Sequence, residues 1–403
     1  MTLRKTIFWL HLIAGLVAGV VIGIMSFTGA ALAFEKDLVA WAERDVRVVT
    51  PPENAMRLDL NNLRARFNLA HPDVTPTAVT VFDSRTAAVA FQVGRSGTYY
   101  VNPYTGEVRE PAGSRMKDFM RLMTDWHRWL ALEGEGRAVG KAITGACNTA
   151  FLVLALTGLY LWWPQKWRFP ALKRSLWFVK SHTGRARDWN WHNVIGFWSL
   201  PVLIVLTASG MVISYPWASN LVYQLAGEEA PVRRGPPGGG GGERGAGGAP
   251  AGQTPGQGGA QGAGREGGER HAAREALPSL DEAFARAVVA EPEWTAITLP
   301  LSPNQANSAT VKTPGMWPRT ASTTLKFDPQ SGDLVERADF ASLSTGRQAR
   351  TWLRFLHTGE ALGFWGQLVA GLACVGGCVL VYTGFALSWR RFFGRKTAAS
   401  SAA

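Results

Sequence analysis

Four of the seven histidines in the sequence stand beside long apolar segments, where ionisable side chains are rare. His11 and His192 lie at the starts of two such segments, and His127 and His357 lie shortly before two others. Neutral imidazole is a common ligand for metal ions, and ionisable residues in or beside membrane-spanning segments are usually functional. Any one of the four could equally be an interfacial histidine bonded to a carbonyl group or a lipid headgroup. Only the arrangement of all four can distinguish this role from metal binding.

The arrangement follows an internal repeat. HLIAG begins at His11 and HNVIG begins at His192, and a hydroxyl residue followed by glycine comes seventeen residues later in both, as Thr28-Gly29 and Ser209-Gly210. The segments LTGLYLWW (156–163) and YTGFALSW (382–389) also correspond, as do VNPYTGEVRE (101–110) and FDPQSGDLVE (327–336). The chain is therefore predicted to be a parallel duplication with a pseudo-twofold axis along the membrane normal.

Four nearly charge-free runs must position these histidines. A helix needs about 20 apolar residues to cross the hydrocarbon, and each run is long enough: Ile7 to Phe34, Ala142 to Trp163, Val194 to Trp217, and Leu362 to Trp389. The first run exceeds the roughly 7–15-residue core of a signal peptide, so we expect a retained helix. The expected fold class is a membrane all-α four-helix bundle with an internal parallel repeat and two small α+β modules outside the membrane.

Lysine and arginine residues set the expected orientation. They precede the first run, follow the fourth, and dominate the segment from Lys166 to Arg187 between the second and third. Such segments are cytoplasmic under the positive-inside rule, which places both termini in the cytoplasm of a multi-pass bacterial inner-membrane protein. The net charge of +12 is then mostly a topology signal, and we expect lipid but no nucleic acid as a partner.

The pseudo-twofold axis predicts how the histidines pair. His11 and His192 would face each other at the inner membrane face, and His127 and His357, which correspond more loosely, at the outer face. Two opposed imidazoles suit axial ligation of haem iron, whereas zinc needs more ligands than two histidines. We therefore expect two haem b groups, each held by two histidines.

The remaining candidates have simpler explanations. Cys374 and Cys378 are one helical turn apart but lack further ligands, so with Cys147 they are expected to pack as small apolar residues. Gly15 and Gly196 would leave room for a porphyrin, although they suit close helix packing equally well.

The other histidines lie in hydrophilic segments. His71 and His182 are expected in loops, and neither has an assigned role. His271 lies within residues 227–276, whose Gly, Pro, Ala and Gln content predicts a disordered linker. The glycines 238–242 in that linker are not a phosphate-binding loop, because no strand precedes them.

Each hydrophilic module is predicted to be one helix followed by strands. The first has a helix at Leu58–Leu69 and strands at Ala78–Phe82, Ala87–Val93, Thr98–Val101 and Glu107–Arg109. In the second, Ser279 caps a helix to Ala290, with Glu282 completing a capping box. Strands follow near Ala296–Leu299, Ala309–Lys312 and Thr323–Phe327.

An ordered set of motifs carries a family resemblance: HLIAG with Thr28-Gly29, LTGLYLWWP (156–164), WHNVIGFW (191–198), LHTGEALG (356–363), VNPYTGEV and FDPQSGDL. Outside the Gly-rich linker, the chain resembles the PepSY-associated transmembrane-helix family, bacterial iron-regulated inner-membrane proteins that include ferric-siderophore reductases. The family's haem-ligating histidines map onto His11, His127, His192 and His357, with DWHRW around His127 the least similar motif. The long linker within the second module departs from the family pattern.

The resemblance and the apolar runs together divide the chain. The transmembrane helices are expected at 1–34, 136–163, 192–217 and 357–389, with PepSY-like periplasmic modules at 35–135 and 279–356. A basic cytoplasmic loop is expected at 164–191, the disordered linker at 218–278, and a cytoplasmic tail at 390–403.

The resemblance implies a haem-dependent ferric-siderophore reductase that moves electrons from the cytoplasmic side to a periplasmic ferric siderophore and releases Fe(II) for uptake. No residue beyond the haem ligands is assigned a catalytic role. No nicotinamide-binding fingerprint follows a strand, so the donor would be a separate protein, quinol or flavin carrier. Two alternatives stay open: a siderophore or iron permease component without redox activity, and a PepSY scaffold that regulates periplasmic peptidases.

Overall fold

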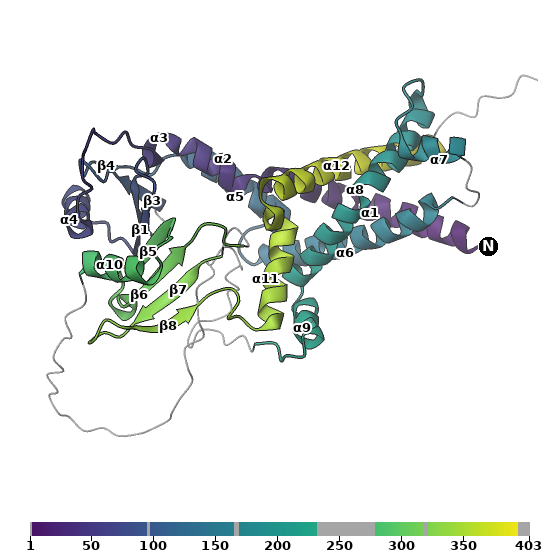
Figure 1. Ribbon diagram of the computed structural model, residues 1–403. Coiled ribbons are helices and arrows are strands. Elements are labelled where there is room, and N and C mark those ends of the chain that lie inside the picture. Colours follow the sequence, from purple (N-terminus) through teal and green to yellow (C-terminus); the bar gives the residue numbers. More distant parts are fainter. Residues whose placement is uncertain (1, 95–96, 165–168, 232–278, 318–320, 394–403) are drawn as a thin grey trace, which may run out of the picture. The chain divides into compact units, whose positions relative to one another are not determined.

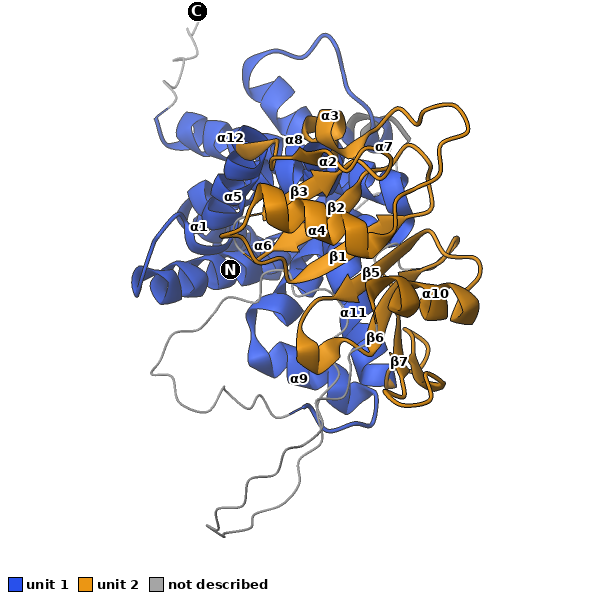
Figure 2. Cartoon of the chain, turned by 90° about the vertical axis from the view of Figure 1, so that its left-hand side faces the viewer, with its two compact units in different colours: residues 1–39, 115–231, 345–403 blue, residues 40–114, 232–344 orange. Residues whose placement is uncertain are grey.

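The structure, a computed structural model, describes residues 2–94, 97–164, 169–231, 279–317 and 321–393. Most of the Gly-rich linker, including His271 and the glycines 238–242, lies outside the described residues, as do Lys166, Arg168 and most of the C-terminal tail. The chain divides into two compact units (Figure 2). Unit 1 comprises residues 1–39, 115–231 and 345–403, and unit 2 comprises residues 40–114 and 232–344.

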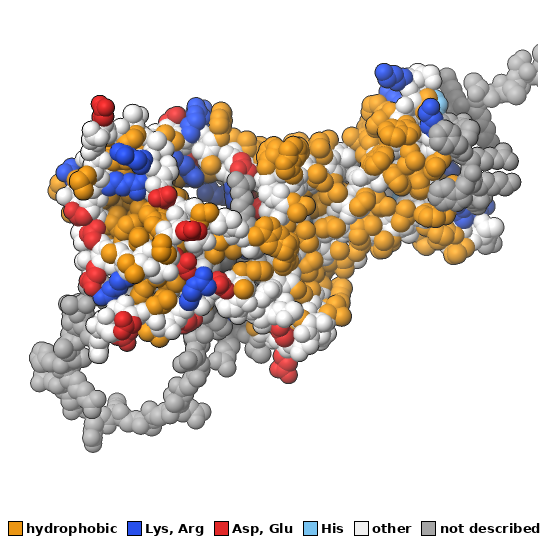
Figure 3. Space-filling view, viewed as in Figure 1, with side chains coloured by type: hydrophobic (Ala, Val, Ile, Leu, Met, Phe, Trp, Pro, Cys, Tyr) orange, Lys and Arg blue, Asp and Glu red, His pale blue; other side chains and the backbone are white. Residues whose placement is uncertain are grey.

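Unit 1 contains four helices long and apolar enough to cross a membrane, as the sequence predicts. They are α1 (Leu3–Leu32), α6 (Gly136–Trp162), α8 (Gly184–Ser214) and α12 (Gly363–Phe392) (Figure 1). Large apolar side chains such as Val17 (80% exposed) and Leu372 (62%) cover their outward surfaces, and Figure 3 shows hydrophobic side chains along these helices. Apolar surface this extensive suits lipid rather than water, and the chain is a membrane protein.

Small residues allow these helices to approach closely. α12 packs against α8 and α1, and α6 packs against the same two helices. A Cβ atom on Gly19 of α1 would lie 2.8 Å from the ring of Phe385, and one on Gly377 of α12 would lie 2.6 Å from Oγ of Ser26. Glycine at such contacts lets van der Waals packing hold membrane helices together.

Two further helices lead into α6 and α12, as expected for the segments that carry His127 and His357. They are α5 (Ser114–Trp129) and α11 (Thr345–Thr358). Leu130 and Ala131 follow α5 with left-handed backbone (φ 53° and 56°), and the 3₁₀ turn η2 (Glu360–Leu362) follows α11 after Gly359 (φ 76°). These left-handed residues end both helices abruptly and turn the chain into the next span.

The helices of unit 1 differ from the expected segments at two boundaries and within one loop. The basic loop contains α7 (Phe169–Leu176), and α8 begins at Gly184 instead of residue 192. The early start of α8 is possible because its buried Asp188 pairs with Arg187 and Arg390. The linker expected from residue 218 begins later, since α9 (Pro216–Leu225) starts at a proline, whose fixed φ suits the first helical position.

Unit 2 is built on one antiparallel sheet of eight strands in the order β4-β3-β2-β1-β5-β6-β7-β8. The strands are β1 (Ala78–Phe82), β2 (Val89–Val93), β3 (Gly97–Val101), β4 (Val108–Arg109), β5 (Ala296–Pro300), β6 (Ser308–Lys312), β7 (Thr323–Phe327) and β8 (Leu334–Ala338). The sequence predicts the first seven closely and misses β8. It also treats the strands as two modules, whereas β1 pairs with β5 along its whole length and joins them into one sheet.

The helices α4 (Leu60–Ala70) and α10 (Leu280–Ala290) share one apolar core with this sheet. Phe67 and Ala287 are fully buried there against strand residues such as Phe91. Ser279 caps α10 through the backbone N–H of Glu282, as predicted. Two short helices, α2 (Glu35–Ala42) and α3 (Arg44–Arg47), precede the sheet in the chain, and a 3₁₀ turn, η1 (Pro303–Gln305), precedes β6.

Candidate functional site: two histidine pairs in unit 1

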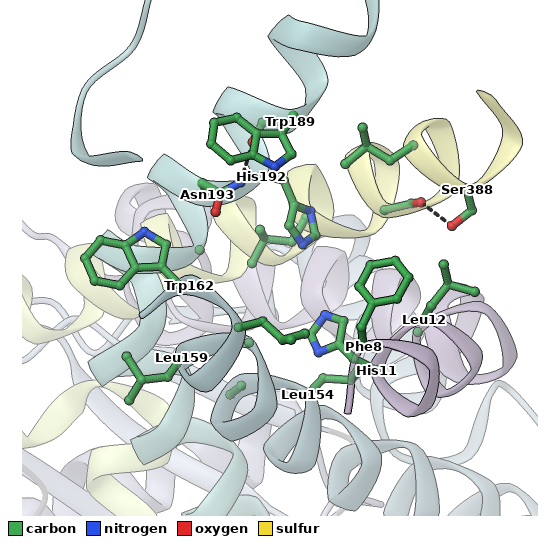
Figure 4. Close-up of a pocket in the computed structure, with 18 of the residues that line it drawn as sticks. Phe8, His11, Leu12, Leu154, Leu159, Trp162, Trp189, His192, Asn193 and Ser388 are labelled. Atoms are coloured by element: carbon green, nitrogen blue, oxygen red, sulfur yellow. Dashed lines mark hydrogen bonds between the residues drawn. The ribbon is translucent and has the colours of Figure 1, made fainter. Parts of the chain in front are cut away.

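His11 of α1 and His192 of α8 line the same cavity, which has a volume of about 810 Å³. Figure 4 shows their rings extending toward one another from the two helices, with Phe8 and Trp162 nearby. The volume falls within the range of about 300–1,000 Å³ that is typical of sites for small molecules and cofactors. The two histidines therefore share one largely apolar cavity, and their joint ligation of a haem iron stays a prediction.

Six glycines line this cavity: Gly15, Gly19, Gly158, Gly196, Gly377 and Gly384. A Cβ atom on Gly158 would lie 3.4 Å from Cε1 of His11, and one on Gly384 would lie 3.8 Å from Cε1 of His192. Both distances are ordinary van der Waals contacts, so each of these two glycines borders an imidazole ring. Gly15 and Gly196 line the cavity at positions where a Cβ would meet only ordinary contacts, so a flat ligand can approach the backbone of α1 and α8.

Basic residues also line the cavity: Arg4, Lys5, Arg185 and Arg391. Arg4 donates to the carbonyl oxygen of Leu161 at 2.5 Å, and the guanidinium of Arg391 lies 4.8 Å from the ring centroid of Phe8. An apolar cavity with cations at its edge suits a ligand that is mostly apolar and carries acidic groups.

His127 of α5 and His357 of α11 form the second pair. Their ring centroids are 6.3 Å apart, with 59° between the ring planes. This separation leaves space between the rings for one metal ion bonded to a nitrogen of each at about 2.0 Å. The second pair could therefore hold a single metal ion.

Burial keeps this second pair neutral. Desolvation, with a smaller contribution from neighbouring His357, lowers the pKa of His127 to about 4. Desolvation also lowers the pKa of His357, against a hydrogen bond to the carbonyl of Leu206 that raises it. A neutral imidazole has a lone pair on one ring nitrogen, as metal ligation requires.

Arginines gather beside the second pair. Arg128 follows His127 on α5, and its guanidinium and that of Arg137 both lie 4.6 Å from the ring centroid of Trp129. Burial first, and then repulsion from Arg354 of α11 and from Arg137, lowers the pKa of Arg128. A cluster of like charges stabilises an anion that binds near it.

In the structure, each of the four paired histidines contacts a side-chain hydroxyl group, which the sequence analysis did not predict. Nδ1 of the histidine lies 2.9–3.2 Å from the side-chain oxygen in four matching pairs: His11 with Thr157, His127 with Thr28, His192 with Thr383, and His357 with Ser209. A glycine follows each hydroxyl residue in the sequence. The signal was present, because each of the four apolar runs contains such a Thr-Gly or Ser-Gly pair, although the second run also contains Thr144-Gly145.

The other histidines and the cysteines lie apart from these pairs. His71 in unit 2 packs against Phe67 and Tyr99, and His182 lies in the turn before α8. Cys374 belongs to an apolar cluster between α8 and α12, as its predicted packing role requires. Within the described ranges, no three His, Cys, Asp or Glu side chains gather as a metal site.

Comparison with known proteins assigns the chain to a family. A search of curated proteins gives no match to the chain. The family described as the PepSY-associated TM region matches residues 8–391, which include all four paired histidines and both units. Since the match covers nearly the whole sequence, the chain belongs to the PepSY-associated transmembrane family.

Proposed function

We propose that the chain is a haem-binding reductase of the bacterial inner membrane that reduces ferric siderophores. The observation that carries the proposal is the pairing of four partly buried histidines into two sets, one in a shared cavity and one at a ring separation of 6.3 Å. Haem, when bound, would supply a one-electron centre that cycles between Fe(III) and Fe(II). The residues that would hold it are His11 with His192, and His127 with His357.

The donor set fits haem better than other metal centres. Each pair offers two imidazoles, which would be enough to hold a haem iron, whereas a zinc ion would need further ligands. The first cavity adds glycines against a flat ring and cations such as Arg4 and Arg391 for acidic substituents. These features favour a porphyrin with carboxylate side chains.

The internal repeat accounts for the way in which the four histidines pair. His11 and His127 come from the first half of the chain, and His192 and His357 from the second. Each half thus supplies one ligand to each pair, as expected for parallel halves related by a twofold axis along the membrane normal.

The arginine cluster supports an anionic substrate near the second pair. Arg128, Arg137 and Arg354 would attract a negatively charged ferric chelate toward His127 and His357. This side would be periplasmic, because the basic residues Arg4, Lys5, Arg390 and Arg391 lie at the opposite ends of α1 and α12 and are expected in the cytoplasm. The overall reaction adds one electron from a separate donor to Fe(III), giving Fe(II), which hard oxygen ligands hold less tightly.

A haem count on the purified chain tests the cofactor. We expect two haem b per polypeptide by pyridine haemochrome, falling to one in His11→Ala/His192→Ala and to one in His127→Ala/His357→Ala. His71→Ala, whose ring lies in unit 2, is the matched control and should keep two. A colourless wild-type protein, or pair variants that keep both haems, would show that the proposal is wrong.

A redox assay tests the substrate. Protein reduced anaerobically with dithionite should be reoxidised by a ferric siderophore but not by the same siderophore loaded with redox-inert Ga(III). If haem is present and neither chelate reoxidises it, the substrate assignment fails while haem binding stands. Transport of the intact chelate without reduction would instead favour a permease.

A further inference from the structure

In all four histidine–hydroxyl contacts, the imidazole is the hydrogen-bond donor and the hydroxyl is the acceptor. Each hydroxyl lies close to the carbonyl oxygen four residues earlier in its own helix, at 2.6–2.8 Å: Thr28 to Ile24, Thr157 to Val153, Ser209 to Val205, and Thr383 to Val379. A hydroxyl has one hydrogen to donate and two lone pairs that accept. With its hydrogen given to the helix carbonyl, each hydroxyl can only accept from the imidazole.

Main-chain carbonyls support the same direction at three of the four rings. Nδ1 of His357 lies 2.8 Å from the carbonyl oxygen of Leu206. His127 and His192 also form hydrogen bonds with the backbone of Met25 and Leu380. A carbonyl oxygen accepts and never donates, so Nδ1 of His357 carries the hydrogen.

His11 differs from the other three. Among the described residues, the hydroxyl of Thr157 is its one hydrogen-bond acceptor at Nδ1. His357 has two acceptors, Leu206 at 2.8 Å and Ser209 at 3.2 Å. Loss of the hydroxyl should therefore matter most at His11 and least at His357.

We propose that Thr28, Thr157, Ser209 and Thr383 are positioning residues that hold their histidines in the Nδ1–H tautomer, so that Nε2 is the ligand atom. The glycine after the hydroxyl leaves room for the ring most clearly beside His357, where a Cβ on Gly210 would lie 3.2 Å from Cε1. A Cβ on Gly29 would lie 3.4 Å from Cε1 of His127, at the limit of an ordinary contact.

The hydrogen bond at Nδ1 also changes the basicity of the imidazole as an iron ligand. An imidazole that donates from Nδ1 becomes a more basic ligand at Nε2, which stabilises Fe(III) relative to Fe(II). The hydroxyls should therefore lower the reduction potential of the haem in addition to orienting its ligands. This part rests on the proposed haem function, whereas the tautomer does not.

The decisive variant is Thr157→Val, which removes the hydroxyl at nearly constant shape. In the purified protein we expect a haem affinity about 10-fold to 100-fold lower and a higher midpoint potential at the His11–His192 site alone. Thr157→Ser, which keeps the hydroxyl, should have the haem affinity and the midpoint potential of the wild-type protein. Thr149→Val is the control, because Thr149 lies on the same helix and its hydroxyl donates only to its own helix carbonyl.

Ser209→Ala tests the role of the second acceptor. We expect little change in affinity or potential at the His127–His357 site, because Leu206 still accepts from Nδ1. If Thr157→Val behaves like Thr149→Val, the positioning role is wrong. If Ser209→Ala is as damaging as Thr157→Val, the carbonyl of Leu206 does not replace the hydroxyl, and the expected ranking of the two sites is overturned.

Nitrogen-15 NMR of histidine-labelled, haem-free protein in lipid separates this inference from the proposed function. We expect Nδ1–H signals for the four histidines, and Thr157→Val should remove that of His11. Nε2–H signals in the wild-type protein would overturn the inference even if haem binds. Nδ1–H signals in a protein that binds no haem would leave the tautomer assignment standing and refute the function.

Discussion

The imidazole of His11 on α1 meets the hydroxyl of Thr157 on α6 at 2.9 Å, although 146 positions separate the two residues in the chain. The contact exists because α1 and α6 run in opposite directions, so that the start of one lies beside the end of the other. The same relation joins His192 at the start of α8 to Thr383 near the end of α12. Four predictions follow from this and other contacts in the two units.

The glycine beside His357 should be intolerant of any side chain. A Cβ on Gly210 would lie 3.2 Å from both the ring of His357 and the amide of Asn148. We expect Gly210→Ala to destabilise the protein by about 1–3 kcal/mol and to lower haem content at the second pair. In Gly23→Ala, the nearest side-chain atom would be 3.5 Å away, so thermal unfolding in detergent should match wild type. Equal melting temperatures for the two variants would contradict the close contact.

The buried carboxylate at the start of α8 should be important for stability. Asp188 is fully buried and pairs with Arg187 at 2.9 Å and Arg390 at 3.2 Å. Asp188→Asn should cost about 2–3 kcal/mol, below the roughly 3–5 of a fully buried pair, because both arginines are partly hydrated. Asp118→Asn breaks an exposed pair with Arg121 and should change stability by less than about 0.5 kcal/mol. Thermal shift assays compare the two, and similar shifts would refute the ranking.

The arginine cluster should affect substrate capture more than turnover. Arg128→Gln is expected to raise KM for an anionic ferric siderophore about 10-fold at low salt, with kcat nearly unchanged. The difference from wild type should shrink as ionic strength rises, since salt screens the attraction. Arg115→Gln, an exposed change near the start of α5, serves as the control. An unchanged KM in Arg128→Gln would place the substrate elsewhere.

The phenol of Tyr100 in unit 2 should ionise at a higher pH than an ordinary tyrosine. Burial raises its pKa, as does its hydrogen bond to Glu43 at 3.1 Å, while Arg47 opposes the shift. The folded state therefore favours the neutral phenol. That stabilisation is fully present below the unfolded value of about 10 and is lost as the pH rises through the folded pKa.

Ultraviolet titration of the phenolate absorbance checks this prediction. The wild-type protein should show one tyrosine that ionises later than the rest, and Tyr100→Phe should remove that component. If Tyr100→Phe instead removes a component that titrates near pH 10, the environment assigned to Tyr100 is wrong.

Local sequence pattern was sufficient for much of the architecture. Apolar runs of span length predicted α1, α6, α8 and α12, because burial in lipid depends on composition along one segment. Alternation and turn residues predicted β1 and β7 with the bounds that the structure gives them. The capping of α10 by Ser279 could also be read locally, since a cap and its helix are adjacent in the chain.

Contacts between distant segments needed the tertiary structure. The pairing of β1 with β5 joined two expected modules into one sheet, and no local pattern specifies which edges meet. The sequence identified the four histidines and displayed the four hydroxyl–glycine pairs, but it could not match them. Only the packing of antiparallel helices decided that Thr157 faces His11 and that Thr28, on the same helix as His11, faces His127 instead.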